Sequence, residues 1–153
     1  VWHASSTRQA FVEALNSAGV EVHQEIVWVK ESFQLGRADY HWQHETCLYG
    51  WRRKHKFYGG RSQSTVWEVH RDGIGAHPTM KPVEVYARPM RNHLRSGEVA
   101  LDMFLGSGTA LIAAEKVGCR CFGMEIDPYF CDVIVVRWES FTGEKALLER
   151  GEG

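Results

Sequence analysis

The spacing of apolar residues changes most clearly between residues 98 and 129. A short apolar run at 99–101 ends at Asp102, and a glycine-containing turn follows it. The next apolar residues recur at helical spacing until Gly118, and a second apolar run occupies 119–126. This order predicts a strand, a tight turn, a helix and a second strand parallel to the first. In such a βαβ unit the turn and the end of the second strand share one edge of the sheet, so we expect a ligand site there.

Apolar runs elsewhere predict further strands and helices, which together indicate an α/β fold. Three runs rich in β-branched and aromatic residues have strand composition; they are 20–30, 46–51 and 64–69. Three others have apolar residues on one helical face; they are 5–19, 82–97 and 128–143. Ser5 or Ser6 is the expected cap of the first helix. Pro89 lies inside the second helix and removes one backbone hydrogen bond, so we expect a kink or break there.

Composition narrows the class of protein. The 153 residues, 44% of them hydrophobic, are enough for about one domain. No apolar run reaches the length of a membrane span and no signal-peptide pattern opens the chain, so we expect a soluble protein with no membrane partner. The four cysteines, Cys47, Cys119, Cys121 and Cys131, lack paired spacing, which favours buried thiols over zinc ligands or disulfides. A reducing cytoplasm is the expected compartment.

A net charge of −1 excludes a uniformly basic nucleic-acid binder, but the charge is uneven. The stretch 51–61 contains aromatic residues and no acid, and it carries five basic residues: Arg52, Arg53, Lys54, Lys56 and Arg61. Basic and aromatic residues together are typical of a surface that contacts phosphates and unstacked bases. A solvated hairpin tip at Gly59 and Gly60 explains the same composition equally well.

His41 and His44 lie close to Cys47 in the sequence, which raises the question of a metal site. A third well-placed ligand is missing from this stretch, and zinc sites in proteins use three or four protein ligands. Tyr40 and Trp42 favour an aromatic loop that packs near a functional pocket instead. We therefore expect no metal ion.

The glycine turn itself narrows the ligand. Gly106, Ser107, Gly108 and Thr109 provide neither the Lys of a phosphate-binding P-loop nor the third glycine of a dinucleotide fingerprint, so a pyrophosphate ligand is disfavoured. An acid precedes the turn, and Glu125 follows it at close to the spacing of about 20 residues at which a carboxylate meets ribose hydroxyls in such folds. Adenosine without phosphates and with a cationic group fits this pattern, as in S-adenosylmethionine.

Three short sequences then indicate a family. LDMFLGSGT resembles the cofactor loop, motif I, of DNA methyltransferases that modify adenine N6 or cytosine N4, and MEIDPYF resembles their acidic motif II. HPTMKP at 77–82 is similar to their motif X. Here the motif X match precedes the motif I match, as in the circularly permuted β group of that family. The stretches YHWQHETCLYG and QSTVWEV are similar to members as well, so the resemblance covers most of the chain.

The resemblance implies a Rossmann-like methyltransferase fold: an incomplete, doubly wound, mostly parallel sheet with an antiparallel edge hairpin. It implies one partial domain over 1–153, in which 51–76 is a basic loop or hairpin that contacts double-stranded DNA and 77–143 is the cofactor-binding half. The five basic residues of 51–61 become the expected DNA contacts. A bacterial or phage protein of a restriction-modification system is the expected context.

The resemblance also implies which residues bind S-adenosylmethionine. Thr79 and Lys81 would bind its methionine carboxylate, Asp102 its ammonium group and Glu125 its ribose. The complete set of expected cofactor-binding residues is Thr79, Lys81, Asp102, Phe104, Gly106, Ser107, Gly108, Thr109, Glu125, Ile126 and Asp127.

The catalytic motif of the family is missing from the chain. That motif, Asp-Pro-Pro-Tyr or a close variant, holds the target amino group while its aromatic ring stacks on the flipped base. The one Asp-Pro pair here is Asp127 and Pro128, inside the motif II match, and in the permuted order the motif would lie before Val1. We therefore expect the carboxyl-terminal part of a methyltransferase, inactive alone and without a catalytic residue of its own.

Two other functions stay open. A non-catalytic module that binds cofactor or DNA has the same sequence features, and a nicotinamide-dependent oxidoreductase shares the βαβ unit but needs a third glycine. The strand that carries the missing motif would lie beside 98–102, so its absence predicts an exposed sheet edge and self-association through that edge. Val99 and Leu101 would then face water, and Met103 and Phe104 would lose their cover.

Overall fold

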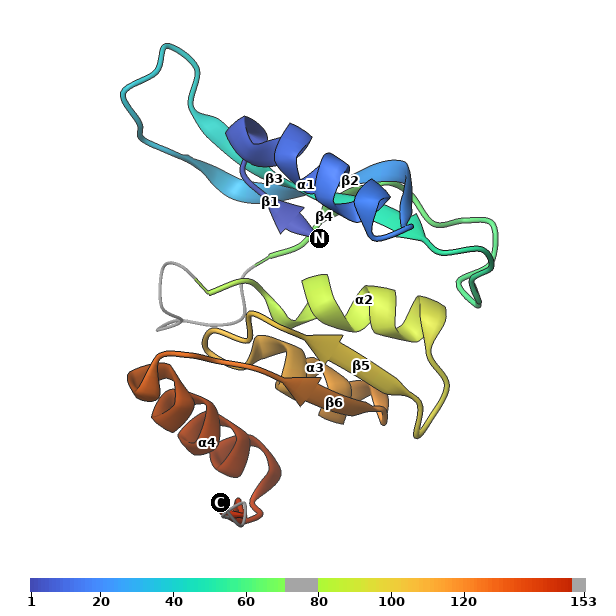
Figure 1. Cartoon of the computed structure of the whole chain (residues 1–153). Helices are drawn as coiled ribbons and strands as arrows, with labels where there is room; N and C mark the ends of the chain where they lie inside the picture. Colours follow the sequence, from blue (N-terminus) through green and yellow to red (C-terminus); the bar gives the residue numbers. More distant parts are fainter. Residues whose placement is uncertain (71–79, 150–153) are drawn as a thin grey trace. The chain divides into compact units, whose positions relative to one another are not determined.

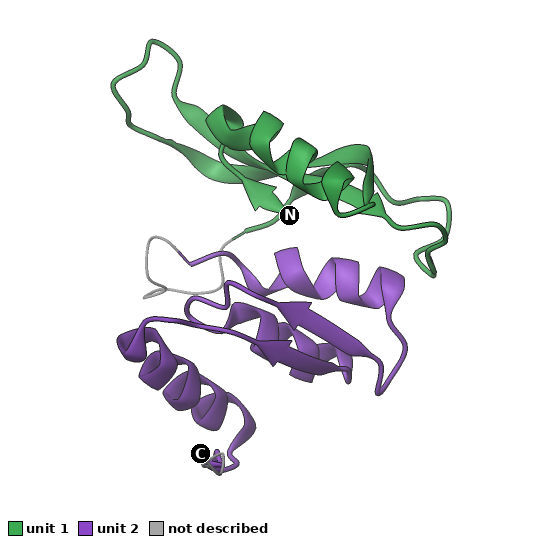
Figure 2. Cartoon of the chain, viewed as in Figure 1, with its two compact units in different colours: residues 1–74 green, residues 75–153 purple. Residues whose placement is uncertain are grey.

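The computed structural model describes residues 1–70 and 80–149. The chain divides into two compact units, unit 1 at 1–74 and unit 2 at 75–153 (Figure 2). Within the described residues each unit has its own sheet (Figure 1). Thr79 and most of the motif X match therefore lie outside the described residues, whereas Lys81 lies inside them.

Unit 1 is built on a long antiparallel hairpin. Its strands β2 and β3 pair from Glu21 and Trp51 to Gln34 and Trp42, with register shifts after Val22 and after Val29. The sheet order is β1-β3-β2-β4, where β1 is antiparallel to β3 and β4 is parallel to β2. The elements in chain order are β1 (Trp2–His3), a 3-10 helix (Ser5–Thr7), α1 (Arg8–Ser17), β2 (Glu21–Gln34), β3 (Trp42–Trp51) and β4 (Val66–Glu68). The expected antiparallel hairpin is thus confirmed.

Two tryptophans and a leucine form the centre of unit 1. Trp28, Leu48 and Trp67 are almost fully buried. The Trp28 indole N–H donates to the Val69 carbonyl at 3.0 Å, and the Trp2 ring meets the edges of Trp28 and Trp67 with centroids 6.5 and 6.3 Å apart. Such edge-to-face pairs contribute about 0.5–1.5 kcal/mol beyond the area that they bury. Aromatic packing therefore holds β1, β2 and β4 together.

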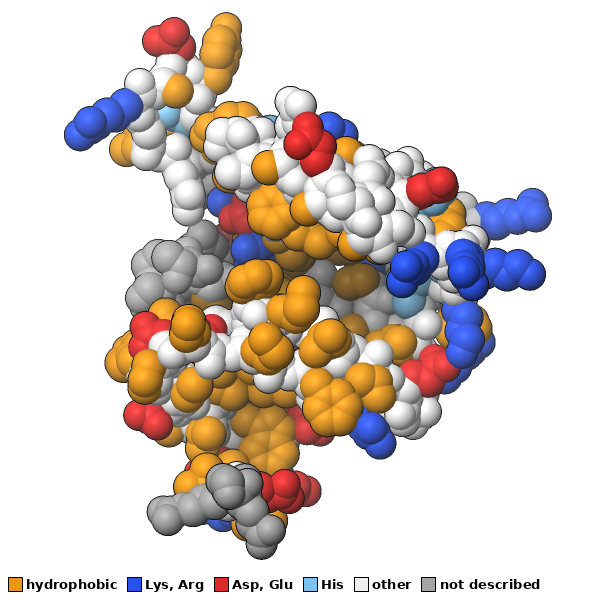
Figure 3. All heavy atoms as spheres, in the orientation of Figure 1, with side chains coloured by type: hydrophobic (Ala, Val, Ile, Leu, Met, Phe, Trp, Pro, Cys, Tyr) orange, Lys and Arg blue, Asp and Glu red, His pale blue; other side chains and the backbone are white. Residues whose placement is uncertain are grey.

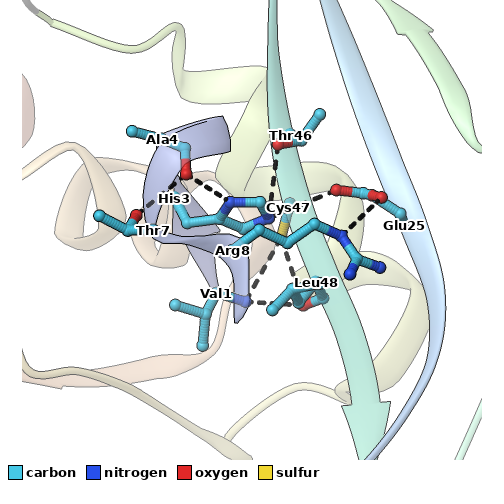
Figure 4. A network of polar contacts seen from close by, with 9 residues as sticks. All are labelled: Val1, His3, Ala4, Thr7, Arg8, Glu25, Thr46, Cys47 and Leu48. Carbon is cyan, nitrogen blue, oxygen red and sulfur yellow. Dashed lines mark hydrogen bonds and ion pairs between the residues drawn. The ribbon is translucent and has the colours of Figure 1, made fainter. Parts of the chain in front are cut away.

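A polar network fastens β1 and α1 to the hairpin (Figure 4). The backbone nitrogen of Val1 donates to the Leu48 carbonyl at 2.7 Å. Glu25 on β2 accepts from Arg8 Nε at 3.3 Å and pairs with His3 Nε2 at 3.4 Å. The partly exposed Arg8–Glu25 pair contributes at most about 1 kcal/mol, so it positions α1 more than it stabilises the fold.

The boundaries of unit 1 correct two expectations. The strands expected at 20–30 and 46–51 extend further than predicted, because β2 continues to Gln34 and β3 begins at Trp42. Cross-strand pairing there satisfies backbone groups that a loop would leave to water. The cap expected at Ser5 or Ser6 is wrong. Those residues form the 3-10 helix, and α1 begins at Arg8 after Thr7, which makes no side-chain capping bond.

Unit 2 contains the βαβ unit expected from the sequence. Strands β5 and β6 are parallel and pair from Val99 with Arg120 to Asp102 with Gly123. The elements in chain order are α2 (Val83–His93), β5 (Val99–Asp102), α3 (Thr109–Val117), β6 (Arg120–Gly123) and α4 (Pro128–Thr142). The second strand ends at Gly123, three residues before the expected end, and Gly143 in the left-handed conformation ends α4 as expected.

Helix α2 is continuous through Pro89, so the expected break is wrong. A proline inside a helix costs about 3 kcal/mol. Val83, Ala87 and Met90 are buried in a cluster with Ala113 of α3, and burial of one Val or Met side chain contributes about 1.5–3 kcal/mol. Packing against α3 is therefore large enough to keep the helix intact.

The small sheet of unit 2 is covered on one face. Ala100 and Cys121 pack against the cluster around α3, whereas the alternate residues Val99, Leu101 and Phe122 are exposed. Met103 and Phe104, just after β5, are exposed as well. The exposure expected at this edge is confirmed.

The four cysteines are thiols, with no disulfide between them. Cys119 is buried and Cys121 is half-buried. The burial of Cys121, together with the negative charge of Asp102, raises the pKa of the Cys121 thiol to about 11. Cys131 is exposed on α4, which corrects the expectation that all four are buried. In the described parts of the chain, no helix combines the length and the hydrophobicity needed to cross a membrane.

A candidate cofactor site at the glycine turn and a basic loop

The glycine turn of unit 2 requires glycine for steric reasons. Gly106 and Gly108 have φ of 54° and 80°, a left-handed conformation that disfavours residues with a Cβ. Gly108 precedes the first residue of α3, and a Cβ there would approach Ile134 Cγ1 of α4 to 3.1 Å. The turn is therefore sharp and packed against α4 at one point.

Glu125, just after β6, holds this turn from the next strand. Its Oε2 accepts from the Gly106 N–H at 2.7 Å, and its Oε1 accepts from the backbone N–H groups of Ile126 and Asp127 at 2.9 and 3.0 Å. The Asp127 N–H bond is the main reason why the pKa of Glu125 lies below its ordinary value. The carboxylate thus joins the ends of the two strands at the edge where the ligand was expected.

Two other acids accept bonds from the backbone nearby. Asp102 Oδ1 accepts from the Phe104 N–H at 3.0 Å, which orders the start of the turn. Asp127 Oδ1 accepts from the Tyr129 N–H at 2.9 Å and so caps α4. Phe104 and Ile126, which follow the acids Asp102 and Glu125, are 84% and 96% exposed. The site therefore combines fixed carboxylates with exposed apolar side chains.

Arg137 of α4 is a site residue that the sequence did not reveal. Its Nη1 donates to the Ser107 carbonyl, to Ser107 Oγ at 3.0 Å and to Thr109 Oγ1 at 3.4 Å. The Arg137 cation lies near the N-terminus of α3, where the helix dipole makes a positive charge unfavourable by about 0.3–1 kcal/mol. The three hydrogen bonds offset this cost. In the sequence, Arg137 lies on the apolar face of the helix together with Phe130, Ile134 and Trp138. This position predicts that Arg137 is partly buried, but it does not predict which groups Arg137 binds.

The expected cofactor residues of the turn lie together. Gly106, Ser107, Gly108 and Thr109 form it, and Asp102, Phe104, Glu125, Ile126 and Asp127 surround it at the ends of β5 and β6. Lys81 is half-buried just before α2. The structure thus collects the predicted residues of 102–109 and 125–127 at one sheet edge.

The basic residues of 52–61, here called the basic loop, follow β3. All five, Arg52, Arg53, Lys54, Lys56 and Arg61, are exposed, and several Lys and Arg side chains gather at this end of unit 1 in Figure 3. Of the two expected forms, loop or hairpin, the structure has a loop, because β4 pairs with β2 and not with β3. A hairpin would have needed β3 and β4 to be neighbours.

A stack of three rings orders the start of the basic loop. Trp51 at the end of β3 lies between the rings of His23 and His55, with centroids 3.6 and 3.8 Å away and interplanar angles of 15° and 29°. Arg53 has a φ of 65°, and the Lys54 N–H donates to the Arg52 carbonyl at 2.9 Å. The loop therefore leaves the sheet in a defined turn.

The histidines considered for a metal site have other surroundings. His41 stacks on Phe33 with centroids 5.2 Å apart, and His44 lies in β3 opposite Val29. Within 1–70 and 80–149, no three His, Cys, Asp or Glu side chains are arranged to hold a metal ion. Tyr40, expected to pack near a pocket, is exposed.

Comparison with known proteins identifies the family. Residues 3–136 match the profile of the N6 and N4 DNA methylases. The chain is 24% identical over 161 residues to the type II methyltransferase M2.DpnII of Streptococcus pneumoniae, covering 92% of this chain and 60% of that protein. It is 32% identical over 97 residues to the type II methyltransferase M.Cfr9I of Citrobacter freundii, covering 61% and 32%.

A solved structure shows the same fold. The M1.HpyAVI–SAM complex superposes with a TM-score of 0.76 at 20% identity, covering 90% of this chain and 72% of that one. The chain spans 60% or less of the length of the two curated relatives named above. The chain therefore belongs to the adenine-N6 and cytosine-N4 DNA methyltransferase family and has the α/β fold of that family.

Proposed function

We propose that the chain forms the cofactor-binding half and part of the DNA-contacting surface of a site-specific DNA methyltransferase. The reaction is transfer of a methyl group from S-adenosylmethionine to the N6 amino group of adenine or the N4 amino group of cytosine. The observation that carries this proposal is the glycine turn of unit 2, which Glu125 holds through one hydrogen bond to Gly106 and Arg137 holds through three to Ser107 and Thr109. Family membership supplies the reaction class.

The residues around the turn suit a cofactor without phosphates. Two carboxylates, Asp102 and Glu125, lie within a few residues of the turn, and they would repel a phosphate. An ammonium group and ribose hydroxyls are both donors, and we assign the ammonium to Asp102 and the ribose to Glu125. A carboxylate offers about four acceptor positions and Glu125 uses three on the backbone, so one is left for a hydroxyl.

The remaining parts of the cofactor match the other residues at this edge. Phe104 and Ile126 are exposed apolar side chains beside the acids, and we assign them to the adenine ring. Lys81, before α2, is assigned to the methionine carboxylate together with Thr79, which lies outside the described residues. Bound S-adenosylmethionine supplies an electrophilic methyl group on its sulfonium.

We assign the basic loop to double-stranded DNA. Its five cations are exposed within ten residues of chain, and the His23, Trp51 and His55 rings order the start of the loop that carries them. Neutralised phosphates release counterions, and each such contact adds about 0.9 to the slope of log affinity against log salt. Affinity for DNA of mixed sequence should therefore fall steeply as salt rises.

The 153 residues contain no Asp-Pro-Pro-Tyr motif. The one Asp-Pro pair, Asp127 and Pro128, lies inside the motif II match, and Asp127 caps α4 by accepting from the Tyr129 N–H. We therefore propose that the chain places no group on the target nitrogen. Without such positioning a large share of the rate enhancement is lost. This observation favours the alternative function as well, a non-catalytic module that binds cofactor or DNA.

We also propose that the chain associates with itself through the edge of β5, as expected from the sequence, and through the uncovered face of β5 and β6 beside that edge. Val99, Leu101 and Phe122 form an apolar patch there, and Met103 extends it. Apolar patches of this kind mark interaction surfaces, and an unpaired strand edge favours sheet extension.

Calorimetry on the whole chain with S-adenosylmethionine and with its demethylated product tests the cofactor assignment. Glu125→Gln should raise the dissociation constant at least tenfold, because hydrogen bonds to charged groups contribute about 1.5–3 kcal/mol. Glu139→Gln is the matched control, since that acid binds the backbone at the other end of α4. Equal affinity in both variants contradicts the ribose assignment.

Tritiated methyl transfer to DNA by the same preparation should stay at background, and incorporation would show that other residues hold the base.

A further inference from the structure

The tip of the β2–β3 hairpin carries more exposed apolar surface than the fold needs. We call residues 33–42 the arm. Its four large apolar or aromatic side chains are all exposed, with Leu35 at 84% and Tyr40 at 91%, and Phe33 and Trp42 about half exposed. The arm projects from the end of the sheet in Figure 1, and its side chains extend into open space in Figure 3. Single exposed apolar residues are ordinary, but four in ten residues indicate a binding surface.

The arm has a defined conformation. The last cross-strand pair, Gln34 with Trp42, closes its base. Inside it, the rings of Phe33 and His41 stack at 5.2 Å with an interplanar angle of 20°, and the Gly36 N–H approaches His41 Nδ1 at 3.4 Å. Phe33 therefore packs within the arm, and the Trp42 ring packs edge-on against His44 with centroids 5.3 Å apart. Leu35 and Tyr40 are the more exposed pair, and we take them as the side chains that reach a partner.

The position of the arm in unit 1 indicates which partner. Strand β3 begins at the arm and ends at Trp51, where the basic loop starts. Ten residues of antiparallel strand span about 30 Å. One helical turn of B-DNA is about 34 Å, the distance after which the same groove returns to the same face. The two ends of β3 can thus contact one face of a duplex together.

The charges at the two ends of β3 differ, which indicates that the arm and the basic loop contact DNA in different ways. At the arm, Arg37 and Asp39 offset each other, so the arm has little net attraction for phosphates. The basic loop has five cations and no acid. Electrostatic attraction at one end and apolar side chains at the other are the two components of proteins that insert side chains between base steps.

We propose that the arm is a second DNA contact of this chain, at which Leu35 and Tyr40 enter a groove and unstack a base step while the basic loop holds phosphates about one turn away. This inference rests on the proposed DNA-contacting role. The proposed role of the arm, the unstacking of a base step, is one that we assign neither to the cofactor site nor to the basic loop. Base pairs that unstack easily, such as a mismatch, should be preferred, because the cost of unstacking is lower there.

Fluorescence anisotropy with two 30-base-pair duplexes tests the arm. One duplex is fully paired and the other carries a central mismatch beside 2-aminopurine. The full chain should prefer the mismatched duplex and raise the 2-aminopurine emission. L35S/Y40S should abolish both effects and weaken binding to the mismatched duplex roughly fivefold to a hundredfold, as expected when a base loses a stacking side chain. The salt slope should not change.

Two variants serve as controls. L147S/L148S removes two exposed leucines from unit 2 and should bind like the parent chain. R52Q/R53Q should weaken binding to both duplexes and lower the salt slope while the mismatch preference stays. Because all these side chains are exposed, circular dichroism should show the same fold in every variant.

The outcomes separate the two proposals. If the parent chain shows no salt-dependent binding to either duplex, the proposed DNA-contacting role is wrong and the arm's role with it. If the parent binds and R52Q/R53Q weakens it, but L35S/Y40S behaves like the parent, the arm inference alone is wrong. If L35S/Y40S changes only the sedimentation of the chain, the arm binds a second copy and the DNA contact is rejected.

Discussion

At the scale of single residues, the glycine turn of unit 2 depends on two charged side chains that reach it from other elements. Glu125 connects the end of β6 to the turn after β5, and Arg137 connects α4 to the same turn. Both residues are charged, and both are held by several partners. Each should therefore affect ligand affinity through the shape of the turn as well as through direct contact.

The lowered pKa of Glu125 gives a pH prediction. Because its pKa is below the ordinary value of 4.5 only in the folded chain, its stabilising effect is complete above that pH and is lost as pH falls through the folded pKa. Glu125→Gln should therefore flatten the acid side of the stability profile. Urea unfolding at a series of pH values measures this stability profile. The series should run from roughly 1.5 units below to roughly 2.5 units above the ordinary pKa of Glu, that is from about pH 3 to about pH 7.

Glu139 is the reference for that experiment, since bonds from Lys145 and from the Ala146 N–H lower its pKa too. Glu139→Gln should flatten the profile without a change in cofactor affinity. A Glu125→Gln profile as steep as the parent's would show that the three backbone bonds contribute no stability.

Arg137 gives a prediction about the turn. Arg137→Met keeps much of the side-chain length but removes all three bonds to Ser107 and Thr109. We expect faster amide exchange at 106–109 and a cofactor dissociation constant raised roughly tenfold, which corresponds to the 1.5 kcal/mol or so of one charged hydrogen bond.

Arg91→Met provides the comparison for Arg137. Arg91 lies on α2 in the same unit and pairs with Glu84 on the surface. Its loss should leave exchange at the turn and cofactor affinity as they are. If Arg91→Met and Arg137→Met changed affinity equally, a general loss of charge and not the turn would be responsible.

At the scale of elements, the junction between the turn and α3 is the tightest point of the site. Gly108→Ala imposes the left-handed conformation on a residue with a Cβ, which costs about 1–2 kcal/mol, and it also pushes that Cβ against Ile134. Gly143→Ala carries the same conformational cost at the end of α4, but no atom lies within 4 Å of its Cβ. Chemical unfolding should therefore show a greater loss of stability for Gly108→Ala. Equal losses would mean that α4 moves away at no cost.

At the scale of the whole molecule, the uncovered face of β5 and β6 gives a prediction about assembly. Leu101 is 66% exposed in the middle of the apolar patch. Sedimentation at micromolar concentration should show a dimer for the parent chain and a monomer for Leu101→Lys, because a buried lysine without a partner opposes association. Val136→Lys, at an exposed position of α4, should dimerise like the parent. A monomeric parent with cooperative unfolding contradicts the proposal.

Much of this protein could be predicted from short stretches of its sequence. The βαβ unit, the glycine turn and the half-buried face of α4 follow from apolar spacing and from glycine, because these depend on contacts within a few residues. The antiparallel hairpin was expected from the family resemblance. The order of three motifs indicated the family for the same reason, since each motif is local. Asp102 and Glu125 were placed at the ligand edge because parallel strands bring their carboxyl ends together.

Other features were decided only by tertiary structure. Arg137 meets Ser107 across 30 residues of chain, and no local pattern encodes that meeting. Helix α2 survives Pro89 because α3 packs on it, and β4 joins β2 instead of β3, so the basic residues form a loop and not a hairpin. The free energy of each arrangement comes from burial and hydrogen bonds between distant segments, which exist only once the chain has folded.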